Sequence, residues 1–149
     1  MKNKKSEIKY GYAIFSTTAD VGIRIRGKTY EELYENGVKG LNALVFGKEE
    51  KESPPVDAVG FPFQYEGDSC ENVLVNLLAE VVFLVYNREK ITEGIEIKTA
   101  GKNFLKARLL LRSLGPDQMP EIEIKSVTYH NLKVVEEKGI KSAEIVFDV

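Results

Sequence analysis

Two hydrophobic periods follow one another near the start of the chain. Val21, Ile23 and Ile25 alternate with polar residues or glycine, which predicts a half-buried strand over 21–26. Aromatic and β-branched residues predict an earlier strand over 9–15. The period then becomes helical, with apolar residues at Tyr30, Leu33, Tyr34, Val38, Leu41, Leu44 and Val45. Thr29 and Glu32 form a capping box before this stripe, so we expect a helix from Tyr30 that ends near Phe46-Gly47.

A second apolar helix is predicted after a loop and an extended segment. Residues 48–55 are charged and close with two prolines, which favours a surface loop. Residues 56–65 are extended, and Pro62 indicates an edge strand or a bulge. Asp68 followed by Glu71 predicts a helix start before a broad stripe, which places that helix deep against a sheet. The stripe comprises Val73, Leu74, Leu77, Leu78, Val81, Leu84 and Val85.

The rest of the chain is predicted to form strands joined by short turns, with Gly101 and Gly139 in two of the hairpins. The expected strands cover 91–99, 104–112, 122–129, 132–136 and 140–149. The sequence therefore predicts an α+β fold in which two helices pack against a largely antiparallel sheet or a pair of sheets. We expect one domain over 9–149, preceded by a flexible basic tail over 1–8.

Composition is that of a globular protein, with 43% hydrophobic and 30% charged residues. No apolar run reaches the roughly 18 to 20 residues that a membrane span needs, and no signal-peptide core follows the N-terminus, so we expect a cytoplasmic protein without a membrane partner. Cys70 and His130 are the only residues of their types. A single cysteine cannot form an intramolecular disulfide, and one cysteine with one histidine is too few ligands for a Cys/His zinc site.

The charge balance argues against strong direct binding to nucleic acids. The chain has 21 basic and 23 acidic residues, a net charge of −2. Proteins that grip a phosphate backbone usually carry a clearly basic stripe. Here the basic residues are interleaved with glutamates, as in 49–52 and 121–125, which is typical of a solvated face.

Common catalytic signatures are absent: the chain has no phosphate-binding loop, dinucleotide fingerprint, nucleophile elbow or HExxH motif. His130 lies in a predicted turn, where a lone histidine is more often structural than catalytic. Cys70, in the first turn of the second predicted helix, has two interpretations. The helix dipole would lower its thiol pKa, but without a nearby base or second cysteine we favour a small packing residue.

Asp20 and Asp148 are the remaining candidates. Asp20 opens a strand, where an aspartate is ordinarily a turn former. Asp148 precedes Val149, so its carboxylate adjoins the α-carboxylate of the chain end. Two adjacent anionic groups repel unless a cation lies between them, and oxygen ligands suit Ca²⁺, Mg²⁺ or Mn²⁺. Chain ends are also commonly frayed and solvated, and the residues alone leave both interpretations open.

Four stretches, in order along the chain, resemble the archease family. The first is Thr18-Ala19-Asp20-Val21-Gly22-Ile23, followed by Gly27 and Glu31-Glu32-Leu33. The others are Leu77-Leu78-Ala79-Glu80, Val127-Thr128-Tyr129-His130 and Phe147-Asp148-Val149. The chain departs from the family pattern at Thr17, where histidine is usual, and over 114–119, where a Gly-Glu step is expected.

The resemblance implies a non-enzymatic protein that promotes guanylylation and multiple turnover of the GTP-dependent RtcB-type RNA ligase in tRNA splicing and RNA repair. It also implies a divalent-cation site at Asp20, Asp148 and the terminal carboxylate of Val149, with Ca²⁺ as the first candidate and Mg²⁺ or Mn²⁺ as alternatives.

Two other functions stay open at this level. A module that delivers RNA would need steeply salt-dependent RNA binding, which the near-neutral charge disfavours. A chaperone-like protein-interaction module would need an exposed apolar patch and would be indifferent to Asp20 and Asp148. A metal-dependent enzyme ranks third, because no general base accompanies the predicted cation site.

Overall fold

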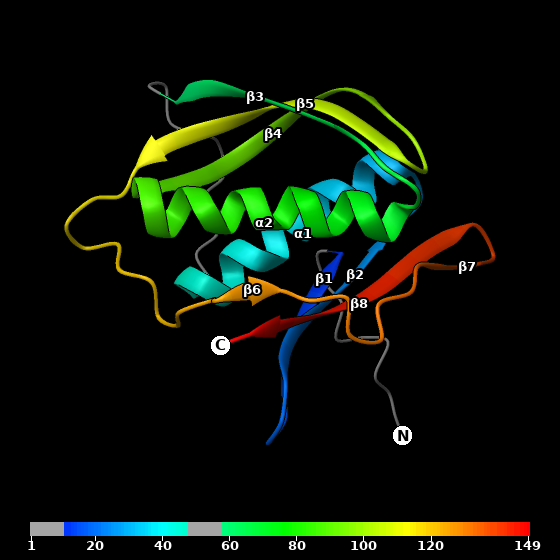
Figure 1. Ribbon diagram of the computed structural model, residues 1–149, viewed down its shortest axis with the longest axis horizontal. Coiled ribbons are helices and arrows are strands. Elements are labelled where there is room, and N and C mark those ends of the chain that lie inside the picture. The colour runs from blue at the N-terminus through cyan, green and yellow to red at the C-terminus, as the bar shows by residue number, and fades with distance from the viewer. Residues whose placement is uncertain (1–10, 48–57) are drawn as a thin grey trace.

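The computed structural model describes residues 11–47 and 58–149, and places both helices between two antiparallel sheets (Figure 1). The strands are β1 (Tyr12–Ser16), β2 (Val21–Gly27), β3 (Val59–Glu66), β4 (Lys90–Ala100), β5 (Phe104–Ser113), β6 (Ser126–Val127), β7 (Val135–Glu137) and β8 (Ile140–Asp148). The helices are α1 (Tyr30–Phe46) and α2 (Cys70–Arg88). The predicted tail, 1–8, and the predicted loop, 48–55, both lie outside the described residues.

One sheet has the order β1-β2-β8-β6, with β7 also paired to β8, and the other has the order β3-β5-β4. All described strand pairs are antiparallel. The α+β class with two helices and a pair of sheets is confirmed. The core lies on both sides of the helical layer, because α1 packs on β1, β2 and β4 while α2 packs on β3, β4, β5 and β6.

Both helices begin with a side-chain cap. The Thr29 hydroxyl accepts from the Glu32 amide at 3.1 Å, as predicted, and the Glu32 carboxylate accepts from the Lys28 amide at 2.8 Å. The second helix starts one residue later than the sequence indicated. Ser69, rather than Asp68, caps it by accepting from the Asn72 amide at 3.1 Å.

Helix α2 is long and apolar enough to span a bilayer by length and composition, with a mean hydropathy of 1.4 in its most apolar window. The expectation that no apolar stretch reaches this length therefore does not hold for α2. Its fully buried residues include Val73, Leu74, Leu77 and Leu78, and they join residues of both sheets in one hydrophobic cluster. This packing is that of a core helix between two sheets.

The predicted strand over 122–129 is wrong except at Ser126–Val127. The alternation of Ile122 and Ile124 does reflect burial, since Ile124 is 3% exposed. However, a side chain takes their backbone groups: the Tyr86 hydroxyl donates to the Ile122 carbonyl at 2.6 Å and accepts from the Ile124 amide at 3.2 Å. The predicted strand over 132–136 is likewise short and shifted, to Val135–Glu137.

Other strand predictions hold closely. Pro62 lies in β3, which pairs with β5 at the edge of its sheet, as expected for a proline that has no amide hydrogen. Gly101 and Gly139 lie in hairpin turns, and Gly139 has φ of +79° after Lys138 at +54°. Two successive residues with positive φ match the twist of the adjoining strands.

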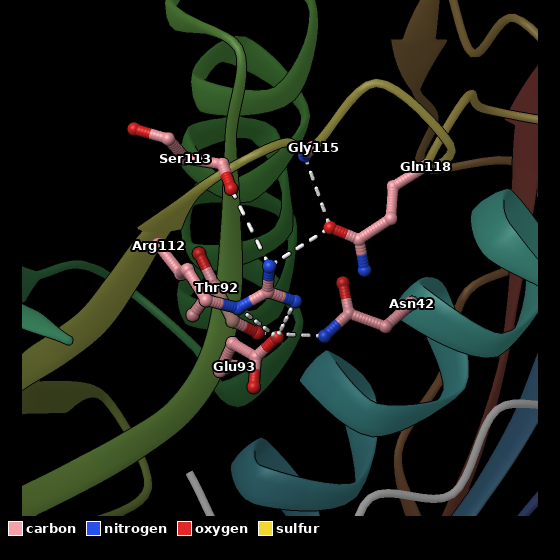
Figure 2. A network of polar contacts seen from close by, with 7 residues as sticks. All are labelled: Asn42, Thr92, Glu93, Arg112, Ser113, Gly115 and Gln118. Carbon is pink, nitrogen blue, oxygen red and sulfur yellow. Dashed lines mark hydrogen bonds and ion pairs between the residues drawn. The ribbon is translucent and has the colours of Figure 1, made fainter. Parts of the chain in front are cut away.

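A buried ion pair joins the two long strands of the β3-β5-β4 sheet (Figure 2). Arg112 donates through Nε and Nη2 to one carboxylate oxygen of Glu93, and the two side chains are only 17% and 6% exposed. Glu93 occupies the bulge of β4 between Thr92 and Gly94. Arg112 also donates at 2.8 Å to Gln118, whose oxygen accepts from the Gly115 amide, so the pair fixes the loop after β5.

The same region contains unsatisfied polar atoms. Asn42 of α1 donates to the Thr92 carbonyl at 2.7 Å (Figure 2). In the part of the chain that the structure describes, the Asn42 Oδ1 and Thr92 Oγ1 atoms are buried without a hydrogen-bond partner. Buried polar groups of this kind cost stability, so this corner of the fold depends on the bonds that Arg112 does make.

Candidate functional site

The pairing of β2 with β8 brings the two predicted aspartates to the same place. Val21 is opposite Phe147 at the end of this antiparallel register, so Asp20 and Asp148, the residues that flank this pair, lie at the same end of the two strands. The two carboxylates therefore leave the sheet at one end, next to the C-terminus, although 128 positions separate them in the sequence.

The turn before β2 explains why the Asp20 carboxylate is available. Thr17, not Asp20, provides the turn's side-chain acceptor: its Oγ1 accepts from the Asp20 amide at 2.9 Å and from the Ala19 amide at 3.2 Å. The Thr17 amide donates to the Asp20 carbonyl at 2.7 Å. Within the described ranges, neither the Asp20 nor the Asp148 carboxylate has a hydrogen bond or an ion pair. The side chain that stabilises this turn is therefore that of Thr17, and the Asp20 side chain is not the turn former.

The short strand β6 adds residues that the sequence did not single out. Ser126 pairs with Asp148, and the Lys125 amide donates to the Asp148 carbonyl at 2.7 Å. Lys125 immediately precedes β6 and is exposed. The sequence singled out neither residue; it gave Lys125 only as part of the segment 121–125, which we interpreted as a solvated face.

The described residues supply few side-chain donors for the predicted cation site. Among residues 11–47 and 58–149, no three or more His, Cys, Asp or Glu side chains gather as metal ligands, so side chains alone supply two carboxylates. Val149, which is 46% exposed, adjoins Asp148 and is the predicted source of a third. Oxygen-only donors with open positions for water suit Ca²⁺, Mg²⁺ or Mn²⁺.

His130 is not one of these oxygen donors. It is exposed in the turn after β6, and its backbone amide donates to the Thr128 hydroxyl at 3.2 Å. Its ring nitrogen Nε2 lies 3.3 Å from the side-chain nitrogen Nδ2 of Asn131. Asn131 has φ of +54°. No carboxylate orients the imidazole among the described residues, which supports a structural role in the turn.

Cys70 belongs to the core. It is 3% exposed, and burial raises the pKa of its thiol to about 11, partly offset by a hydrogen bond with Tyr34. The Tyr34 hydroxyl donates to the Gly101 carbonyl at 2.6 Å, and burial raises the pKa of this tyrosine as well. The helix dipole therefore does not produce a reactive thiolate here.

We expect Cys70 to react with iodoacetamide at pH 8 far more slowly in the native protein than in urea. The reason is that a thiol with a pKa near 11 and almost no exposed surface presents little thiolate to the reagent. Mass spectrometry of alkylated samples over time measures both rates. Equal rates in native and unfolded protein would contradict the buried position.

The chain was compared with known proteins by sequence and by structure. The family model described as "Archease protein family (MTH1598/TM1083)" matches residues 12–149. A protein archease of Methanopyrus kandleri is 32% identical over 136 residues, which cover 89% of this chain and 94% of the relative. The protein archease of Thermoplasma acidophilum is 30% identical over 143 residues, 93% of each chain.

Two solved structures share the fold. The solution structure of Methanobacterium thermoautotrophicum protein 1598 superposes with a TM-score of 0.67 at 20% identity, covering 95% of this chain and 100% of that one. The crystal structure of a Thermotoga maritima archease, described as a possible chaperone, gives a TM-score of 0.60 at 22% identity, covering 91% and 94%. The family match over 12–149 and the relatives across most of the chain show that this protein belongs to the archease family.

Proposed function

We propose that this protein activates an RtcB-type, GTP-dependent RNA ligase in tRNA splicing and RNA repair in the cytoplasm, without catalysing a reaction itself. Membership of the archease family supports this role. The observation that carries the proposal is the convergence of Asp20 and Asp148 at the end of the β2-β8 pair, with neither carboxylate engaged by another described residue. Carboxylates without a structural partner at a chain end are available to a cation or to a protein surface.

In the proposed mechanism, the end of the β2-β8 pair is the surface that contacts the ligase. Asp20, Asp148 and the α-carboxylate of Val149 hold a divalent cation, with Ca²⁺ first among the candidates, or offer their oxygens directly to the metal-dependent nucleotide site of the ligase. Lys125, which immediately precedes β6 and is exposed, supplies a positive charge near this end of the sheet that would attract an anionic group of the ligase or its nucleotide. The rest of the fold fixes the β2-β8 register that brings Asp20 and Asp148 to the same end of the sheet.

The test is RNA ligation under multiple-turnover conditions by a cognate RtcB-type ligase with GTP and Mn²⁺. We compare no addition, the parent protein, Asp148→Ala, and Asp117→Ala as a matched control, since Asp117 is exposed in the loop after β5. We expect stimulation by the parent and the control but not by Asp148→Ala, because removing one of the few oxygen donors leaves nothing that replaces its charge.

Each of the other possible results would contradict a different part of the proposal. Stimulation by all three proteins would keep the ligase partnership and discard the role of the acidic site. Stimulation by none would remove the ligase proposal and favour a protein-interaction module, which an assay of aggregation suppression would then examine. A single-turnover reaction run in parallel shows whether the added protein acts on the chemical steps or on the recycling of the ligase.

A further inference from the structure

The outer face of the β3-β5-β4 sheet is open to solvent on the side away from the helices (Figure 1). In β5, Leu105, Ala107 and Leu109 point into the core. The alternate residues of β5 therefore point outward, and in the described part of the chain no helix or strand covers them. The outward residues of β5 are Phe104, Lys106, Arg108 and Leu110.

This face is basic in a chain that is acidic overall. Residues 96–108, which form the end of β4, the hairpin and most of β5, contain four basic residues and one acidic residue, a local charge of +3 against −2 for the whole chain. The basic residues are Lys98, Lys102, Lys106 and Arg108, and all are exposed. Lys98 is the extra residue of the bulge between Ile97 and Thr99, and Thr99 is opposite Lys106, so the exposed Lys98 lies close to Lys106 in the sheet.

Acidic side chains neutralise only part of this charge. Glu96 lies 3.7 Å from Arg108, with 55% and 48% of the two side chains exposed, so this ion pair is weak and solvated. Glu66 is opposite Phe104 at the far end of β3. Lys98, Lys102 and Lys106 form no ion pair with another described residue.

Two flat groups lie on the same face. The Arg108 guanidinium lies across Gly60 of β3, where an added Cβ would meet Nη2 at 2.5 Å. The Phe104 ring covers Gly101, where an added Cβ would meet ring carbon Cε1 at 2.5 Å, and Phe104 remains 38% exposed. Arg108 and Phe104 are four residues apart on one strand, about 13 Å, with Lys106 between them.

We propose that this face, defined by Lys98, Lys102, Phe104, Lys106 and Arg108, binds single-stranded RNA. Basic side chains in a row attract phosphates, and exposed aromatic and guanidinium planes stack on bases without requiring a particular sequence. An acidic protein surface would use the lysines but would have no need of two flat groups. The inference goes beyond the proposed function, because a cation site at the other sheet does not require an RNA-binding face.

The binding is weak and depends on salt. Three or four phosphate contacts to a single strand predict an affinity that falls about 20- to 50-fold between 50 and 200 mM salt. Affinity of this kind agrees with a chain whose net charge is −2, since the rest of the surface repels the RNA. An RNA already held by a partner would need only this additional contact to stay oriented.

Fluorescence anisotropy with a labelled, unstructured single-stranded RNA of about 20 nucleotides and the full chain, without ligase, tests the proposal. The test variant is Lys98→Glu with Lys106→Glu. The matched control is Lys39→Glu with Lys133→Glu, which makes the same change in net charge at exposed positions away from the face. We expect the test variant to bind at least about tenfold more weakly and the control to bind within about twofold of the parent.

Phe104→Leu separates stacking from charge. It keeps an apolar side chain over Gly101 but removes the ring, so we expect a several-fold weaker affinity with an unchanged salt dependence. Circular dichroism confirms that each variant is folded.

Three outcomes would overturn the proposal: no RNA binding by the parent at 50 mM salt, equal weakening by the two lysine pairs, or displacement of RNA by poly-glutamate as effectively as by unlabelled RNA. The last would indicate an acidic protein partner. Asp148→Ala should bind RNA like the parent, which distinguishes this face from the proposed cation site.

Discussion

Asp148→Asn is expected to lower the affinity for Ca²⁺ by more than about 100-fold, because it removes the negative charge from one of the two proposed side-chain ligands at the end of the β2-β8 pair. The substitution keeps the size of the side chain and the backbone bond from the Lys125 amide to the Asp148 carbonyl. Isothermal titration with Ca²⁺, Mg²⁺ and Mn²⁺ in turn measures the loss and identifies which cation the parent prefers.

Asp117→Asn controls for the general loss of one negative charge and should bind the cation like the parent. An extension of the chain beyond Val149 converts the α-carboxylate into a neutral peptide group, so it should weaken binding in the same way as Asp148→Asn. Cation binding that survives both changes would show that the carboxylates act on a partner directly. A parent protein that binds none of the three cations would remove the cation from the proposed mechanism.

The sequence singled out Asp20 and Asp148 but could not show that they lie at the same end of the β2-β8 pair. Charge reasoning identified Asp148 as unusual, and only the family resemblance placed Asp20 beside it. The reason is that a strand register between residues 21–27 and 141–147 depends on long-range packing, which leaves no local signal. The role of Thr17 as the turn's acceptor was also missed, because Asp20 has the stronger turn-forming propensity of the two.

The same distinction between local and long-range signals explains the fold. The start of α1 was predicted to the residue because Thr29 and Glu32 are close in sequence and satisfy backbone groups within one turn. The segment 122–125 was predicted as a strand and is not one, because the hydroxyl of Tyr86, nearly 40 positions earlier, binds its backbone. Apolar alternation reports burial of side chains and does not identify the partner of the backbone.

The bulge in β4 is a further feature that alternation alone could not predict. Between Thr92 and Gly94 the register shifts, and Glu93 meets Arg112 from the neighbouring strand in a nearly dry environment. A sequence search for charged pairs would find many other combinations of equal merit. Only the bulge determines which carboxylate turns toward this arginine.

Arg112→Met is expected to lower the free energy of unfolding by about 3–5 kcal/mol. The substitution leaves the Glu93 carboxylate, 6% exposed, without its counter-ion in a region that already contains two unsatisfied polar atoms. It also removes the donor that holds Gln118 and, through it, the loop after β5 (Figure 2). Urea denaturation followed by circular dichroism measures the change.

The double variant Arg112→Met with Glu93→Leu separates two contributions to the free energy of unfolding: the net contribution of the ion pair, and the cost of leaving one of its charges buried without a partner. Because desolvation offsets much of the attraction between buried charges, the double variant should lose far less stability than the two single variants predict together.

Arg24→Met is the exposed control: Arg24 lies 2.7 Å from Glu144, but both side chains are about 45% exposed, so the expected cost is at most about 1 kcal/mol. A similar, small cost for Arg112→Met would mean that water reaches Glu93 and that this corner of the sheet opens in solution.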